Sequence, residues 1–174
     1  MRGHMHRRRE TLPKHLLVCV DVDQEGGWLT ELAVVERAAE ITCAFGARMT
    51  VFAVVNPLSM PSPPLGGESE AHWRHADRYN AERERCSRML TRLVDSVRNI
   101  GISVGYRLFE TNDNPVDVIH VASSDLGADM LVIGSTSKLD LVGSGLAGRS
   151  TVPVLVAPCV CTQDPPRTEQ RSGH

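Results

Sequence analysis

Nearly continuous apolar runs alternate along the chain with segments whose apolar residues recur every three or four positions. The short runs predict strands that are covered on both faces, and the helical spacing predicts amphipathic helices between them. The predicted strands are His15 to Val22, Met49 to Val55, Ser103 to Glu110, Met130 to Ile133 and Val152 to Ala157. The resulting order, β-α-β-α-β-α-β-loop-β, favours a single doubly wound α/β domain with a parallel sheet and helices on both faces.

The three predicted helices begin and end at residues that suit helix termini. The first runs from Leu29 to just before Gly46, a residue that readily adopts the left-handed backbone of a helix end. The longest carries an apolar stripe from Cys86 to Ile100. In the third, Asn114 can act as the N-cap and Pro115 takes the first helical position, where the missing N–H of proline costs nothing.

Polar tails flank the region that carries these elements. We assign residues 1–13 and 159–174 to flexible tails and residues 14–158 to one domain, because 174 residues is close to the usual size of a single domain. Within the domain, Pro57 to Gly67 contains four prolines and two glycines. This segment is therefore predicted to be a surface loop.

Composition and charge narrow the classes of function. The formal net charge of -2 provides no excess positive charge for a nucleic acid, and no run reaches the roughly 18 apolar residues of a membrane helix. We therefore expect a cytoplasmic protein that binds neither nucleic acid nor membrane. Five cysteines do not indicate a disulfide framework, and Cys159 and Cys161 are too few ligands for a structural zinc site.

Two acidic residues, Asp21 and Asp23, lie at the carboxyl end of the first predicted strand. In doubly wound sheets, ligands bind beyond the carboxyl ends of the strands, where the strand order reverses. The two carboxylates could hold a magnesium ion or accept a hydrogen bond from a ribose hydroxyl. Equally, one of them could cap the turn while the other is solvated. The end of the second strand, Val54 to Pro57, is expected at the same edge.

The run from Gly134 to Gly148 follows the fourth predicted strand and is rich in small residues. Backbone amides of such a run can line an anion-binding site. The run contains a G-x-G-x-x-G sequence that begins at Gly143. The dinucleotide fingerprint requires these glycines between a strand and a full helix, whereas Pro153 follows only five residues after Gly148. We therefore assign no dinucleotide site here.

Motifs of common hydrolases and transferases are missing from the sequence, which has no G-x-S-x-G, H-E-x-x-H or G-x-x-x-x-G-K-[ST] pattern. A nucleotide-hydrolysing enzyme could use only Asp23, Ser135 and Thr136 near the predicted edge, and none of them is an obvious base. A phospho-acceptor signalling domain on a similar sheet is a further alternative, although no lysine follows the last strand. An enzyme is the less favoured interpretation.

Several of these features resemble the universal stress protein family. The first strand ends in Asp21, the second ends in VVNP, and the stretch GADMLVIGS is followed by a Gly-Ser pair and by VPVLVAP. The likeness covers about residues 14–158. It implies a five-stranded parallel sheet of order 3-2-1-4-5, of the adenine nucleotide alpha hydrolase type. It also implies a homodimer formed by antiparallel pairing of the last strand, Val152 to Ala157.

The resemblance also implies a site for an adenine nucleotide. Asp21 matches the acidic residue of nucleotide-binding members, Val54 matches the adenine contact, and Gly134 matches the first glycine of the motif that holds ribose and phosphates. The candidate cofactor-binding residues are Asp21, Val22, Asp23, Val54, Ile133, Gly134, Thr136, Ser137, Gly143 and Ser144. The expected cofactor is ATP or another adenine nucleotide, with magnesium in the case of a triphosphate.

The glycine motif departs from the family pattern. Ser137 stands in place of its second glycine, and Gly143-Ser144 comes four residues early, so backbone conformations that suit glycine are lost. The chain between Gly134 and Pro153 is also short, so the last helix is predicted to have about one or two turns or to be absent. We therefore expect a stress-response regulatory module that acts as a homodimer and in which nucleotide binding is weak or lost.

Overall fold

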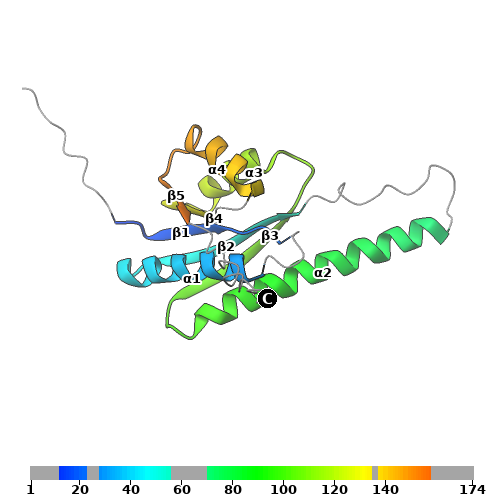
Figure 1. Ribbon diagram of the computed structural model, residues 1–174, viewed down its shortest axis with the longest axis horizontal. Coiled ribbons are helices and arrows are strands. Elements are labelled where there is room, and N and C mark those ends of the chain that lie inside the picture. The colour runs from blue at the N-terminus through cyan, green and yellow to red at the C-terminus, as the bar shows by residue number, and fades with distance from the viewer. Residues whose placement is uncertain (1–11, 23–27, 56–69, 135–136, 158–174) are drawn as a thin grey trace, which may run out of the picture.

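One five-stranded parallel sheet forms the centre of the fold (Figure 1). The computed structural model describes residues 12–22, 28–55, 70–134 and 137–157. The strands are β1 (His15–Cys19), β2 (Arg48–Val55), β3 (Ser103–Glu110), β4 (Met130–Gly134) and β5 (Val154–Ala157). Their order is β3-β2-β1-β4-β5, and every neighbouring pair is parallel. The strand order implied by the resemblance is confirmed.

Helices cover both faces of this sheet, as the alternation of elements predicts. The four helices are α1 (Trp28–Phe45), α2 (Glu70–Arg98), α3 (Pro115–Asp125) and α4 (Ser137–Ala147). In Figure 1, α1 and α2 lie on one side of the sheet and α3 and α4 on the other. The two faces accordingly carry two separate hydrophobic clusters.

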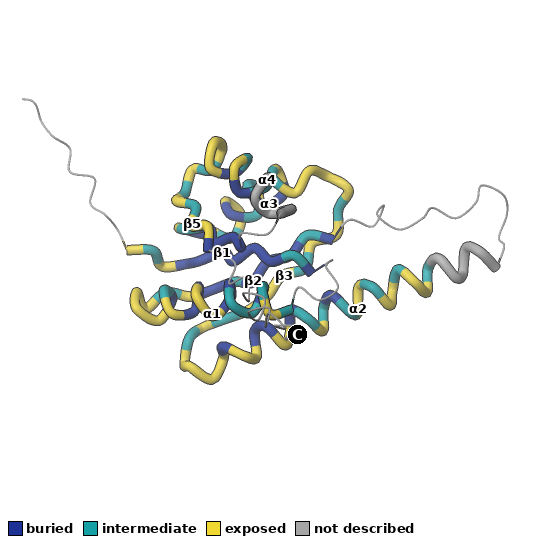
Figure 2. Tube along the Cα trace, viewed as in Figure 1, coloured by how far each residue is buried: buried dark blue, intermediate teal, exposed yellow. Residues whose placement is uncertain are grey.

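Strand β1 shows why the sequence contains continuous apolar runs. Leu16, Val18 and Val20 belong to the cluster under α1 and α2, whereas Leu17 and Cys19 belong to the cluster under α3 and α4. All five side chains are buried, and β1 runs through the centre of the buried region in Figure 2. Successive residues of a strand point to opposite faces, so a strand covered on both sides needs apolar residues at every position.

The structure confirms the predicted N-terminus of one helix and the predicted C-terminus of another. The side chain of Asn114 accepts a hydrogen bond of 2.9 Å from the backbone N–H of Val116, and Pro115 is the first residue of α3. At the other kind of end, Gly46 follows α1 with a φ of 62°, a backbone conformation that few residues other than glycine adopt.

The prediction of a short or absent last helix is wrong. Helix α4 has 11 residues, about three turns, so a helix and not a loop precedes the last strand, which itself begins at Val154. The glycines of this segment fit into α4 because it packs closely on its neighbours. A Cβ added at Gly145 would lie 3.1 Å from a methyl group of Val116, and one at Gly143 would lie 3.8 Å from a methyl group of Val156.

Helix α2 has 29 residues, and its N-terminal half projects beyond the sheet (Figures 1 and 2). Two ion pairs lie within the helix, between Glu82 and Arg85 and between Glu84 and Arg88. No helix in the described part of the chain has the length and apolar character to cross a membrane. The predicted loop from Pro57 to Gly67, the C-terminal tail and residues 1–11 lie outside the described residues.

Candidate functional site

The strand order reverses at β1, because the chain passes from β1 to β2 on one side and later returns to β4 on the other. Cys19 is in register with Phe52 of β2 and with Ile133 of β4. Asp21 follows Cys19 by two residues and Gly134 follows Ile133 by one, so both lie at the carboxyl edge of adjacent parallel strands. This is the edge at which doubly wound proteins bind ligands.

The other predicted contacts at this edge differ in exposure. Asp21 and Val54 are partly exposed, whereas Val22, Ile133 and Gly134 are buried. The buried residues can therefore offer a ligand little more than backbone atoms. Val54 follows Phe52 in the strand that neighbours β1, which puts its backbone at the same edge as Asp21.

Two predicted site residues, Asp23 after β1 and Thr136 between β4 and α4, lie outside the described residues. Ser137 is the first residue of α4, so the helix begins three residues after Gly134. The N–H groups of the first turn of a helix have no partner within that helix, and they attract anions. The start of α4 is thus the anion-attracting feature of this edge.

The Gly143-Ser144 pair does not lie in a loop. Both residues belong to α4, six and seven residues after its start, and Gly143 packs against Val156 of β5. Gly145 similarly faces Val116 of α3. In this structure the first two glycines of the G-x-G-x-x-G sequence pack against the neighbours of α4, whereas Gly148 follows the helix and has no close neighbour among the described residues.

Sequence reasoning missed Glu31, a carboxyl group within the first turn of α1. Its side chain is only 1% exposed, and its Oε2 atom has no hydrogen-bond partner among the residues that the structure describes. The backbone N–H of Asp21 donates a hydrogen bond to the Glu31 carboxyl. A periodicity signal was present, because Glu31 shares the buried face of α1 with Val34, Val35 and Ala38.

Burial governs the ionisation of this carboxyl. Desolvation raises the pKa of Glu31 from 4.5 to about 8, the hydrogen bond from Asp21 lowers it, and the negative charge of Asp21 raises it. Cys19, whose side chain belongs to the cluster on the other face of the sheet, is also buried, and burial, with the Glu31 charge as a smaller cause, raises the pKa of its thiol to about 12. At neutral pH, Glu31 is therefore protonated and the Cys19 thiol is neutral.

The described residues at this edge can be compared with what a metal site requires. Within residues 12–22, 28–55, 70–134 and 137–157, no three His, Cys, Asp or Glu side chains come together as a metal site would require. Cys159 and Cys161 lie outside those ranges. What the described residues bring together is a partly exposed carboxylate, the end of a buried strand and the start of a helix.

The family model of the universal stress proteins matches residues 13–158. No curated protein matches the chain. Among solved structures, a universal stress protein family member from Burkholderia pseudomallei is similar, with 23% identity, a TM-score of 0.65, and coverage of 84% of this chain and 96% of that chain.

Two further similar structures contain nucleotides. A universal stress protein in complex with cAMP has 21% identity and a TM-score of 0.56, covering 85% of this chain and 98% of that chain. An Arabidopsis thaliana protein of the same family with AMP bound has 17% identity and a TM-score of 0.59, covering 89% of this chain and 98% of that chain. At these identities the likeness shows a shared fold.

Proposed function

The chain belongs to the universal stress protein family, and from this premise we propose that it is a cytoplasmic regulatory module of the stress response. In this proposal it binds an adenine nucleotide weakly at the carboxyl edge between β1 and β4 and acts as a homodimer. In this proposal the nucleotide serves as a regulatory ligand.

The observation that carries the proposal is the common edge of Asp21 and Gly134. Gly134 ends β4 and Asp21 comes two residues after the end of β1, the adjacent parallel strand, at the point where the strand order reverses. Similar proteins with the same fold contain cAMP and AMP. A shared fold alone does not determine function, so the support comes from the residues at this edge.

Each group at the edge has a role that its chemistry allows. The Asp21 carboxylate accepts a hydrogen bond from a ribose hydroxyl, and the backbone at Val54 contacts the adenine. The backbone at Gly134 and the N–H groups of the first turn of α4, which begins at Ser137, contact phosphate. Asp23 and Thr136 are further proposed contacts that lie outside the described residues.

Weak binding follows from the residues that accompany Gly134. Ser137 stands where nucleotide-binding members resembling this chain have a second glycine, so the backbone freedom of glycine is lost at this position of the sequence. Gly143 and Ser144, which would otherwise complete the motif, belong to the body of α4. We expect a nucleotide with one phosphate to lose less affinity from these changes than ATP.

A homodimer is supported by the character of β5. This strand pairs with β4 along one edge, and no strand in the described part of the chain pairs with its other edge. Leu155 and Val156 are 37% and 48% exposed, and an uncovered apolar edge strand favours pairing with a second copy.

Titration calorimetry with AMP, and with ATP plus magnesium, tests the nucleotide site. We expect micromolar binding by the wild-type chain that Asp21→Ala weakens by about tenfold. Asp125→Ala, which removes an exposed carboxylate from the end of α3, is the matched control and is expected to leave binding unchanged. Absence of heat at millimolar nucleotide would refute the proposed ligand.

A further inference from the structure

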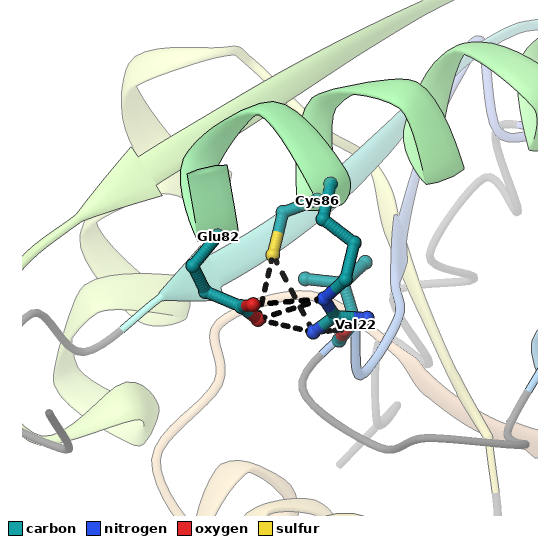
Figure 3. Close-up of polar contacts among 4 residues, drawn as sticks. Val22, Glu82 and Cys86 are labelled. Atoms are coloured by element: carbon teal, nitrogen blue, oxygen red, sulfur yellow. Dashed lines mark hydrogen bonds and ion pairs between the residues drawn. The ribbon is translucent and has the colours of Figure 1, made fainter. Parts of the chain in front are cut away.

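Helix α2 holds the segment that follows β1. The Nη2 atom of Arg85 donates a hydrogen bond of 2.9 Å to the backbone carbonyl of Val22, the residue next to Asp21 (Figure 3). The guanidinium is held in turn by Glu82, whose two carboxylate oxygens each lie 2.9 Å from the Nε atom of Arg85. The two side chains are about one-third exposed, at 34% and 31%, so solvent screens this pair less than a fully exposed one.

The Asp21-Val22 pair is therefore held from two helices on the same face of the sheet. The N–H of Asp21 binds the Glu31 carboxyl of α1, and the carbonyl of Val22 binds Arg85 of α2. The Val22 side chain is also buried. With the backbone fixed on both sides of the Asp21 carbonyl, the direction in which the Asp21 side chain leaves the backbone is fixed as well.

A second group of contacts ties α2 to a different strand. Tyr79 and Arg83 both bind the carboxylate of Glu110, the last residue of the edge strand β3. Arg83 belongs to the same helix as Arg85 and also bonds to a residue at a strand end, but β2 separates β3 from β1. This contact offers an internal comparison for the role of Arg85.

We propose that Arg85, held by Glu82, is a positioning residue that orients the Asp21 carboxylate for the ribose hydroxyls of the bound nucleotide. This inference rests on the proposed function. A binding group that is already oriented loses less conformational freedom when the ligand arrives, so the fixed backbone increases affinity. Without Arg85, the carbonyl of Val22 loses its partner on α2 and the Asp21 carboxylate takes up several directions.

The test measures the contribution of the ribose hydroxyls directly. AMP and 2′,3′-dideoxyAMP are titrated into the wild-type chain, Arg85→Ala and Asp21→Ala. The wild type is expected to bind AMP about tenfold more tightly than the dideoxy analogue, a ratio that corresponds to one good hydrogen bond. In Arg85→Ala this ratio is expected to approach one, as in Asp21→Ala, while affinity for the dideoxy analogue changes little.

Two variants separate positioning from a general loss of structure. Arg83→Ala removes a comparable side chain from the same helix and is expected to keep the wild-type ratio. Arg85→Lys keeps a donor for the Val22 carbonyl but loses the paired contact with Glu82, so its ratio is expected to fall between those of wild type and Arg85→Ala. It also provides a measurement should Arg85→Ala not fold.

The outcomes distinguish the two proposals. If the wild type binds neither nucleotide, the proposed function fails and this inference fails with it. If the wild type discriminates between the two nucleotides and both Arg85 variants discriminate equally well, nucleotide binding stands and the positioning role is wrong. If Arg83→Ala lost the discrimination between the two nucleotides as fully as Arg85→Ala, the positioning role of Arg85 would also be wrong. The loss of discrimination would then reflect a change in α2 as a whole.

Discussion

The backbone N–H of Asp21 donates a hydrogen bond to the carboxyl group of Glu31, which links the partly exposed edge of the sheet to a buried acid on α1. Because burial raises the pKa of Glu31 to about 8, this acid carries a proton at neutral pH. Its ionisation would bring a second negative charge next to Asp21 in a buried position.

Stability is therefore expected to fall as the pH rises from 4.5 to 8. The pKa of Glu31 is higher in the folded chain than in the unfolded chain, so the unfolded chain releases this proton first as the pH rises. The stabilisation that the protonated Glu31 gives the folded chain is therefore lost progressively up to the folded pKa. The loss should amount to roughly 2–5 kcal/mol. Urea unfolding at about pH 5 and pH 8 measures it.

Two variants test this assignment. Glu31→Gln keeps the shape of the side chain but cannot ionise, so its stability should decline less with pH than that of the wild type. Glu36→Gln changes an exposed carboxyl on the same helix and should leave the decline unchanged. An identical decline in wild type and Glu31→Gln would show that Glu31 is not responsible.

His15 is expected to remain neutral and to destabilise the protein in acid. Burial, followed by the charge of Arg48, lowers its pKa from 6.5. The ring lies 3.0 Å from the Leu126 carbonyl through Nδ1 and 2.9 Å from the Thr50 hydroxyl through Nε2. Because the folded pKa is lowered, the unfolded chain binds the proton first, and stability falls as pH drops below 6.5.

An NMR titration of the histidine ring resonances checks this ionisation. The His15 signals should titrate below pH 6.5, whereas protonation at or above that value would contradict the assigned environment. His15→Gln, which does not titrate, should show a weaker acid destabilisation in urea unfolding.

The two glycines inside α4 should respond oppositely to alanine. At Gly143 an added Cβ makes an ordinary contact, 3.8 Å from Val156, so Gly143→Ala should stabilise the fold by about 0.5–1 kcal/mol through helix propensity. At Gly145 the same atom comes within 3.1 Å of Val116, so Gly145→Ala should lose this gain or destabilise. Thermal unfolding of the two variants measures the difference, and equal shifts would contradict the packing described for α4.

A homodimer through β5 should be sensitive to the outer edge of that strand. The Pro153 carbonyl bonds to Leu131 of β4, and successive residues point to opposite sides, so the N–H of Val154 faces away from β4. Val154→Pro removes this outward donor and should weaken the dimer by about tenfold or more. Light scattering measures the dimer dissociation of Val154→Pro, with Val154→Ala, which keeps the donor, as the control. A dimer that persists unchanged in Val154→Pro would place the interface elsewhere.

Local sequence features were sufficient to predict most elements of the fold. The apolar run at β1 indicates burial on both faces because no polar residue interrupts it between Leu16 and Val20. Asn114-Pro115 indicates a helix start because capping involves only neighbouring residues. The length of α4 was predicted wrongly because it depends on contacts with distant residues. Glycine disfavours a helix in isolation, and only the packing of Gly143 and Gly145 against Val156 and Val116 explains why glycine fits at these positions.

By itself, then, the sequence determined the types of all elements but α4, the parallel sheet and the edge that carries Asp21 and Gly134, because these depend on periodicity, caps and chain alternation. Tertiary structure alone decided the surroundings of that edge. Arg85 is 63 residues from Val22 in the chain, and Glu31 ends beneath Asp21 only because α1 packs on β1. Contacts between side chains and distant backbone leave no periodic pattern in a sequence, so they become visible only when the elements are assembled.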